Sequence, residues 1–598
     1  MCGILGFTGK KDPSVTRGLL KLIHHRGFDD ETIGYQSGLN YAMNRLAIVD
    51  LTKGYYPFRY KHFSLIYNGE IYNYPVLKKK LIKQKVQFKT HCDAEVILPL
   101  FDKYGPKAFA MLEGMFAICI IDHQKKIVYL SRDKSGEKPL YYSQTRGFSF
   151  ASEMKVLLNL SSTKILDRES LSQYLTHGSV FGENTLVTDI KKVPPSHYLR
   201  YSLETQQIEV KQYWSPELFQ ENNYQEDCVS HLTSLIKNAV EIRLLADVPV
   251  GTFLSGGVDS SLVTYFAMNK LKKLKTFSIS FPDQAEDESQ YSQIASKFLG
   301  TEHTEIPCTS THVRTIMEQI GEIIDEPISD PAILPTFLMS KVARKQVKVV
   351  LGGEGADELF GGYYRYQKQL FQLYVNRILS AHHLLPKLLQ NIPSNRVKNF
   401  LKSGKEAYSA QNIWTENELS ELLITGSNTK VLKRDPAVLR SNPMLFLQLS
   451  DYREYLPDQL LMKVDKITMQ HNLEARAPFL DTKLINFAFN LKTKEKIHGL
   501  HNKYLLRKVA AQFLPPEIVW RLKHGFSLPL NDWFRNELKD FAYLTLENVK
   551  EYRHIFNVDF FSKKLEEHMT SEVRYRDKIW SIFVLTEWMK KYQIIECQ

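Results

Sequence analysis

Cysteine is scarce in this sequence of 598 residues. Six cysteines are present, and no two of them form a Cys-x-x-Cys pair. The count excludes a disulfide scaffold, and the spacing excludes a zinc ribbon and a thioredoxin-type motif. Because disulfides form in oxidising compartments, so few cysteines predict a reducing one, and we expect a cytoplasmic location.

Long apolar runs are also missing. No segment reaches the roughly 18 apolar residues of a membrane-spanning helix, and residues 1–7 lack the basic stretch of a secretory signal. The net charge of +12 raises the question of a nucleic-acid partner, but no zinc-finger or RRM motif is present. The lysines of residues 78–85 alternate with Leu77, Leu81 and Ile82, which is typical of the solvated face of an amphipathic helix. We therefore expect neither a membrane nor a nucleic acid as a partner.

The two halves of the chain differ in pattern. Up to about residue 212, short apolar segments separated by Gly, Asn and Asp predict antiparallel strands with a few helices. From about residue 225, strand-like segments alternate with helix-like ones, and this alternation predicts a parallel sheet covered by helices. Beyond about residue 365 the pattern is mostly helical. We therefore predict one domain over residues 2–212 and a second over 225–598.

Cys2 directly follows Met1 and precedes Gly3. A small second residue allows removal of the initiator Met, which would leave Cys2 with both a thiol and a free α-amine. One residue would then carry a nucleophile and its own base. Taken alone this is a weak signal, because most cysteines at position 2 have no catalytic role.

Three further segments strengthen the case for catalysis. We interpret residues 45–50 as a strand that carries Arg45, and residues 67–73 as a turn in which Gly69 allows close approach of a ligand. Residues 91–95 begin a helix with acidic residues in its first turn. Together the segments offer a guanidinium for a carboxylate, an Asn for an oxyanion and acids for an α-ammonium group. This set suits an amino acid such as glutamine.

These segments resemble the class II glutamine amidotransferase domain. The likeness rests on residues 1–4 (MCGI), 25–29 (HRGFD), 45–50 (RLAIVD), 68–73 (NGEIYN), 93–95 (DAE) and 132–141 (RDKSGEKPLY). That family has an N-terminal-nucleophile fold, so the resemblance implies an α+β sandwich with αββα layers. Phe28 departs from the family, which usually has Pro there, and this affects loop rigidity rather than chemistry.

The resemblance also implies roles for individual residues. Cys2 would be the nucleophile with its own amine as general base, and Asn68 and Gly69 would form the oxyanion hole. The residues implied in glutamine binding are Arg45, Ile48, Val49, Asn68, Gly69, Glu70 and Asp93.

A second motif, residues 255–261 (SGGVDSS), lies between a predicted strand and a predicted helix. Its glycines let backbone N–H groups point at a phosphate, and the helix N-terminus adds its dipole. No Lys follows the glycines, so the motif is not a Walker A loop. We expect Ser260 and Ser261 to cap the helix, and Asp259 to reach a phosphate only through Mg²⁺. The motif resembles the pyrophosphate loop of ATP pyrophosphatases, which cleave ATP to AMP.

Residues 352–358 (GGEGADE) follow another predicted strand. Position 358 is Glu where the dinucleotide fingerprint requires a third Gly, so we reject a Rossmann NAD site. Glycines at the end of a strand still indicate a ligand there in an open α/β sheet.

The second half resembles the synthetase domain of the asparagine synthetase family. The likeness rests on residues 353–363, 456–458, 463–466, 474–481 and 503–507 and is weakest over 366–450, which carry no usable motif. With the N-terminal part it covers nearly the whole chain, in family order. It implies an α/β parallel-sheet ATP-pyrophosphatase domain with a largely helical C-terminal part.

This resemblance implies ATP and Mg²⁺ as ligands. Glu354 would orient or deprotonate incoming ammonia, and Lys503 would neutralise charge growing on the phosphates. Asp259 and Asp357 would share Mg²⁺ through the pyrophosphate. The ATP-binding residues implied are Leu254, Ser255, Gly256, Gly257, Asp259, Ser260, Ile279, Gly352 and Gly353.

The combined prediction is a carbon–nitrogen ligase with two active sites and L-glutamine as amido donor. The first site releases ammonia through a Cys2 thioester, and the second activates a carboxylate as an acyl-adenylate, releasing AMP and pyrophosphate. Because ammonium is no nucleophile, we expect a shielded, mostly apolar passage between the two domains. The default acceptor is L-aspartate, which gives L-asparagine through a β-aspartyl-adenylate.

Other acceptors stay open, because relatives with this plan amidate diaminopimelate of peptidoglycan or uronic acids of surface polysaccharides. Other relatives close rings and need no ammonia. The retained glutaminase residues around Cys2 argue against a ring-closing reaction here. The acceptor pocket is expected near Glu354, Tyr363, Arg365 and residues 320–340.

Two rival functions from other classes are an RNA-modifying enzyme and a scaffold protein with an inactive synthetase site. The glutaminase half argues against the first, and the intact synthetase residues argue against the second. The sequence leaves the oligomeric state open, a homodimer included.

Overall fold

The computed structural model of the chain describes residues 2–52, 54, 56–218, 227–282, 287, 289–381, 412–424, 442–521 and 528–596. Much of the 366–450 segment, for which the sequence predicts no role, lies outside these ranges. In the described part, no helix is both long enough and apolar enough to cross a membrane.

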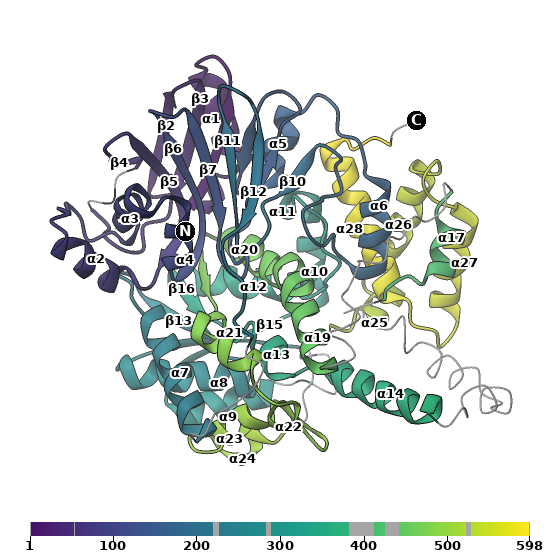
Figure 1. Cartoon of the computed structure of the whole chain (residues 1–598). Coiled ribbons are helices and arrows are strands. Elements are labelled where there is room, and N and C mark those ends of the chain that lie inside the picture. Colours follow the sequence, from purple (N-terminus) through teal and green to yellow (C-terminus); the bar gives the residue numbers. More distant parts are fainter. Residues whose placement is uncertain are drawn as a thin grey trace.

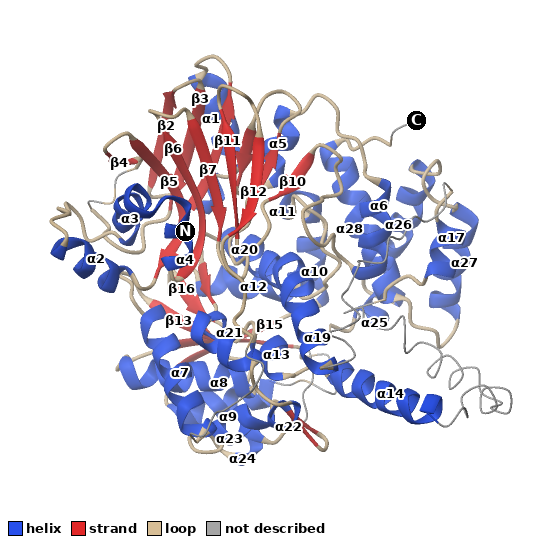
Figure 2. Cartoon of the chain, viewed as in Figure 1, coloured by secondary structure: helices blue, strands red, loops and turns tan. Residues whose placement is uncertain are grey.

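The N-terminal part contains two six-stranded antiparallel sheets (Figure 2). The first has the spatial order β10 (Ile190–Lys192), β8 (Tyr141–Ser143), β9 (Ser149–Ala151), β1 (Cys2–Thr8), β3 (Leu39–Arg45), β2 (Asp30–Gln36). The second has the order β12 (Ile208–Gln212), β11 (His197–Ser202), β7 (Ile127–Arg132), β6 (Gly114–Asp122), β5 (Phe63–Ile71), β4 (Phe58–Tyr60).

Apolar side chains on both faces of each sheet produce a four-layer sandwich. Between the sheets, Ile4 and Tyr41 of the first share one core with Ile66 and Leu130 of the second. Helices α1 (Pro13–Leu22) and α5 (Met154–Leu160) cover the outer face of the first sheet. Helices α2 (Tyr74–Lys83), α3 (Ile97–Tyr104) and α4 (Ala108–Met111) cover the second. The αββα sandwich expected from the sequence is confirmed.

Two local predictions in this part are wrong. Strand β3 ends at Arg45, and residues 46–50 form a loop because the Arg45 guanidinium folds back onto the carbonyl oxygen of Asp50 at 2.7 Å. Residues 67–71 are no turn but part of the continuous strand β5. A Cβ on Gly69 would lie 2.1 Å from the carbonyl oxygen of Met115, so this glycine permits a close approach of β5 and β6 at φ +152°.

The following part is built on a five-stranded parallel sheet. Its spatial order is β15 (Glu302–Pro307), β14 (Lys275–Ser280), β13 (Val250–Phe253), β16 (Val349–Leu351), β17 (Glu474–Arg476). One face packs on α7 (Cys228–Arg243), α8 (Val258–Lys270), α9 (Ser289–Leu299) and α23 (Tyr504–Ala510). The other face packs on α10 (Ser310–Met317), α12 (Ile333–Ala343) and α20 (Met462–Met469). The predicted parallel sheet between helices is confirmed.

Helix α8 begins at Val258. Gly257 takes the N-cap position in an extended conformation, and its carbonyl oxygen accepts the backbone N–H of Ser261 at 3.0 Å. The prediction that Ser260 and Ser261 cap this helix is therefore wrong, since both lie inside its first turn.

Among the described residues, the rest of the chain is mostly helical, as predicted. A π-helical stretch, Asp451–Leu461, leads into α20. The final helices α26 (Lys539–Glu551), α27 (Val558–Thr570) and α28 (Arg576–Tyr592) pack against α6 (Arg168–His177) of the N-terminal part (Figure 1). The other α-helices of this described part are α11 (Ile320–Ile323), α13 (Ala356–Phe360), α14 (Tyr364–Ala381), α17 (Glu416–Leu422), α19 (Pro443–Ser450), α21 (Thr482–Phe489), α22 (Thr493–Lys496), α24 (Pro516–Val519) and α25 (Leu530–Arg535).

Candidate active sites

Cys2 begins β1 and lies opposite Arg45 in the register of β1 and β3. Its side chain is only 5% exposed, and burial raises the pKa of the thiol. A nucleophilic role therefore requires a base to take the thiol proton. The backbone N–H of Cys2 donates to Oδ1 of Asn68 at 2.8 Å, which fixes the start of β1 against β5.

The Nδ2 of Asn68 is an unused donor at this site. It is buried and makes no hydrogen bond within the described part of the chain. Leaving a buried donor unpaired is costly, so such a group is usually matched to a ligand. Asn68 and Gly69 both lie on β5, which the Cys2–Asn68 hydrogen bond joins to the start of β1.

Two acidic residues lie near the same end of the sheet. Asp93, in a 3-10 helix (Asp93–Val96), accepts hydrogen bonds from the hydroxyl of Tyr67 at 2.8 Å and the N–H of Ile71 at 2.7 Å. Burial raises the pKa of Asp93, while burial and then repulsion from Asp93 raise the pKa of Glu70. A bound ammonium group would relieve this repulsion.

The loop after Arg45 is held partly by the second part of the chain. The carbonyl oxygen of Ile48 accepts the N–H of Asp247, and the N–H of Asp50 donates to the Asp247 carboxylate at 2.8 Å. The carbonyl oxygen of Val49 lies 3.4 Å from Arg45 NH2. Sequence reasoning missed Asp247, which is about 200 positions away and belongs to no motif.

Strand β17 also reaches this site and was given no role by the sequence. Arg476 is fully buried, donates to the Glu474 carboxylate at 2.6 Å and lies 3.6 Å from Glu70. Burial works against Glu474 ionisation, but the chain's amino terminus and Arg476 lower its pKa to about 2. Glu474 and Arg476 place two charged residues in a buried strand of only three residues. This unusual pattern is the sequence signal that could have indicated the contact with Glu70.

The nucleotide loop lies between β13 and α8. Ser255 Oγ is 3.1 Å from Ser260 Oγ, so both hydroxyls face the same turn. A Cβ on Gly256 would lie 2.3 Å from the backbone of Tyr291, so only glycine fits at its φ of +68°. A Cβ on Gly353 would lie 3.0 Å from Asp259, which shows that the second glycine-rich loop packs against the first.

The other expected ATP residues flank this loop. The N–H of Leu254 donates to the carbonyl oxygen of Phe277, and both Leu254 and Ile279 are buried. The N–H of Gly352 donates to the carbonyl oxygen of Arg476 at 3.0 Å, which links this loop to β17.

Lys503 joins two carboxylates of this site. Its Nζ lies 2.5 Å from Asp259 and 2.7 Å from Asp357, and the side chain is buried. Burial lowers the pKa of the ammonium, but the two carboxylates outweigh it and raise the pKa. Gly362 leaves room for this pairing, because a Cβ there would lie 2.1 Å from the Lys503 side chain.

The same carboxylates fit a hard cation. The second oxygen of Asp259, Oδ1, is buried and has no hydrogen-bond partner in the described part of the chain. Magnesium prefers carboxylate oxygens together with substrate phosphates. Within the described ranges, no group of three or more His, Cys, Asp or Glu could hold a metal, so phosphates would have to complete such a site.

A small cavity is lined by residues from both parts of the chain. Glu354 borders it on the nucleotide side, and burial raises the pKa of this carboxyl. The full lining is Glu137, Lys138, Glu354, Leu461, Val464, Asp465, Ala475, Arg476 and Ala477. Burial, with repulsion from Asp133, raises the pKa of Glu137 to about 8.

The nucleophile sandwich and the nucleotide loop together define a glutamine-dependent amidotransferase that uses ATP. Two family models match the chain: "Glutamine amidotransferase domain" over residues 1–214 and "Asparagine synthase" over residues 231–590. The chain belongs to the asparagine synthase family of glutamine-hydrolysing carbon–nitrogen ligases.

Curated relatives match over most of their length. "Asparagine synthetase [glutamine-hydrolyzing] 1" of Bacillus subtilis is 30% identical over 98% of this chain and 96% of that protein. "Asparagine synthetase [glutamine-hydrolyzing]" of Rattus norvegicus is 30% identical over 91% of this chain and 87% of that protein. A "Putative asparagine synthetase [glutamine-hydrolyzing]" of Mycobacterium tuberculosis is 29% identical over 98% and 97%.

Proposed function

We propose that this protein makes L-asparagine from L-aspartate, with ammonia from L-glutamine and with conversion of ATP to AMP and pyrophosphate. One observation carries the proposal: a single chain holds the Cys2–Asn68 site and the Lys503–Asp259–Asp357 site. Arg476, which lies 3.6 Å from Glu70 of the first site, lines one cavity together with Glu354. The names of the curated relatives support the choice of aspartate and glutamine.

In the first site, removal of Met1 would turn the Cys2 nitrogen into an α-amine. This amine takes the thiol proton, and the thiolate attacks the glutamine amide carbon. Asn68 Nδ2 and the Gly69 N–H stabilise the developing oxyanion, ammonia leaves, and water hydrolyses the thioester. Arg45 binds the glutamine carboxylate, Glu70 and Asp93 bind its ammonium, and the backbone of Ile48 and Val49 assists.

In the second site, the loop from Ser255 to Ser260 binds the pyrophosphate part of ATP at the start of α8. Asp259 and Asp357 would hold Mg²⁺, which when bound neutralises phosphate charge. Lys503 turns from these carboxylates to the leaving pyrophosphate as the aspartate carboxylate attacks the α-phosphorus. Glu354 accepts a proton from the ammonia that attacks the β-aspartyl-adenylate, and its raised pKa suits this task.

An ion pair beside Glu354 supports an amino acid as acceptor. Lys463 donates to Asp330 at 2.7 Å, and its charge acts on the Glu354 carboxyl. An α-amino acid carries both a carboxylate for Lys463 and an ammonium for Asp330, whereas a uronic acid has no ammonium. Arg365, another expected pocket residue, pairs with Asp451 at 2.8 Å instead.

The acceptor assignment predicts a selective defect in Asp330→Asn. Loss of a charge-assisted hydrogen bond should raise the KM for L-aspartate about 10-fold or more, with the KM for ATP nearly unchanged. Pyrophosphate release from the full-length enzyme measures both constants. Asp540→Asn removes an exposed pair with Arg314 and serves as the control, with normal constants expected. An unchanged KM for aspartate, or stronger stimulation by glucuronate than by aspartate, would count against the assignment.

We also propose that residues 2–212 and 225–598 act as the two functional domains, and that the protein works in the cytoplasm. The five cysteines in the described part are all free thiols, which suits a reducing compartment.

A further inference from the structure

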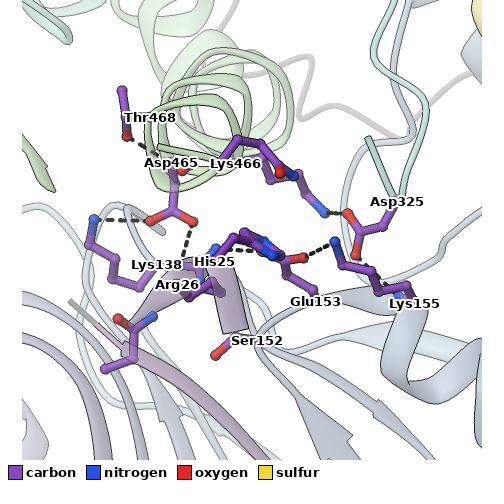
Figure 3. A network of polar contacts seen from close by, with 12 residues as sticks. His25, Arg26, Lys138, Ser152, Glu153, Lys155, Asp325, Asp465, Lys466 and Thr468 are labelled. Carbon is purple, nitrogen blue, oxygen red and sulfur yellow. Dashed lines mark hydrogen bonds and ion pairs between the residues drawn. The ribbon is translucent and has the colours of Figure 1, made fainter. Parts of the chain in front are cut away.

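A buried network of charged side chains joins the two halves of the chain. Arg26 is its centre on the N-terminal side and is fully buried. Its guanidinium donates from Nε to the backbone oxygen of Cys2 at 3.2 Å, from NH1 to Glu153 at 3.0 Å and from NH2 to Asp465 at 2.8 Å. Figure 3 shows Asp465 in contact with both Arg26 and Lys138.

The planar guanidinium makes this arrangement directional. Its N–H groups point along fixed directions, so the two carboxylates that hold NH1 and NH2 also set where Nε points. Glu153 comes from the N-terminal part, whereas Asp465 lies on α20 of the synthetase part. The Cys2 carbonyl is thus held by a side chain whose orientation depends on the other half of the chain.

Asp465 is itself firmly held and charged. It is 1% exposed, and its other oxygen accepts from Lys138 Nζ at 3.1 Å. Burial alone would favour its neutral form, but Arg26 and Lys138 outweigh this effect and lower the pKa of Asp465. The ionised Asp465 carboxylate therefore binds two separate segments of the glutaminase part, one through Arg26 and one through Lys138.

The same turn of α20 also carries Lys463, which belongs to the ion pair proposed to bind the acceptor. Lys463 lies two positions before Asp465 and pairs with Asp330, while Lys466 pairs with Asp325. Residues two apart on a helix point in different directions. One helical turn thus carries a contact to the acceptor pocket and a contact to the glutaminase nucleophile.

We infer that Asp465 of the synthetase part is a positioning residue for the glutaminase nucleophile, acting through Arg26 on the backbone of Cys2. The inference rests on the proposed glutaminase role of Cys2. A misplaced reacting group costs up to about 100-fold in rate, while substrate binding through Arg45 and Asp93 does not depend on this contact. The defect should therefore appear in kcat for glutamine hydrolysis and spare the KM for glutamine.

The test uses Asp465→Asn in the full-length enzyme. We expect kcat for glutamine hydrolysis to fall about 10-fold or more, with the KM for glutamine within about twofold and ammonia-dependent AMP formation near the normal rate. A mutation in the synthetase part would then impair the glutaminase reaction and leave the synthetase reaction intact. Normal glutaminase kcat, or equal loss of both activities, would overturn the inference.

Two further variants separate positioning from damage to the interface. Asp465→Asn leaves Lys138 without its partner, so Lys138→Met with Asp465→Asn removes both charges and should show the same glutaminase defect. Asp325→Asn with Lys466→Met removes a neighbouring buried pair that does not touch Arg26, and glutaminase should stay near normal. Recovery in the first double variant, or equal loss in the second, would overturn the inference.

These outcomes are distinct from failure of the proposed function. If the unmodified protein hydrolyses no glutamine, or if Cys2→Ala still does, then the proposed role of Cys2 and this inference fail together. If Cys2→Ala is inactive while both Asp465 variants hydrolyse glutamine normally, only the inference fails.

Discussion

Replacing Cys2 with Ala is expected to abolish glutamine-dependent amidation while leaving ammonia-dependent amidation at the normal rate. The thiol is the proposed nucleophile, and no second nucleophile is proposed for that site, so glutamine hydrolysis should fall at least about 1,000-fold. The synthetase residues Asp259, Asp357 and Lys503 keep all their contacts in this variant. Glutamate release and AMP formation, measured with glutamine or with an ammonium salt, give the two rates.

Cys119→Ala is the matched control for Cys2→Ala. Cys119 is also a buried free cysteine in the same core between the two sheets, but it has no proposed catalytic role. We expect normal activity with both nitrogen sources, because the small cavity it leaves affects only stability. Loss of both activities in Cys2→Ala, with native folding and a normal Cys119→Ala, would contradict the separation of the two sites.

Replacing Lys503 with Met should give the opposite pattern. Without the ammonium, nothing neutralises charge on the leaving pyrophosphate, and AMP formation should fall about 100- to 1,000-fold. Glutamine hydrolysis should continue, because Lys503 has its ion pairs with Asp259 and Asp357 and not with the glutaminase residues.

Stability must be measured alongside this variant. Removing one partner of a buried ion pair costs roughly 3–5 kcal/mol, because the remaining charges are left uncompensated. Lys508→Met is the control on α23, the helix that directly follows Lys503; the exposed Lys508 side chain lies over the ring of Tyr504 at 4.6 Å. Normal AMP formation in Lys503→Met, or loss of glutaminase alone, would show that Lys503 has been given the wrong role.

The sequence predicted those features that depend on neighbouring residues. The order of strands and helices, the nucleotide loop before α8 and the acidic start at Asp93 all follow from short patterns. The failures are also local. Gly69 was interpreted as a turn because glycine often marks turns, yet here it allows two strands to approach closely within a sheet.

The contacts between the two halves could not be predicted in this way. Arg26 and Asp465 are 439 positions apart, and Asp50 and Asp247 are 197 apart. Neither partner of such a pair carries any sign of the other in a single sequence. The cavity residues Glu137 and Arg476 likewise come from separate segments that meet only in the fold.

The most direct test of coupled amide transfer follows the nitrogen itself. The enzyme is given MgATP, L-aspartate and glutamine labelled with ¹⁵N in its side-chain amide, in the presence of excess unlabelled ammonium, and the products are analysed by mass spectrometry. We predict asparagine that carries mostly ¹⁵N, formed together with AMP in equal amounts. Asparagine labelled only to the level of the bulk ammonium would contradict transfer inside the protein, and absence of asparagine would contradict aspartate as the acceptor.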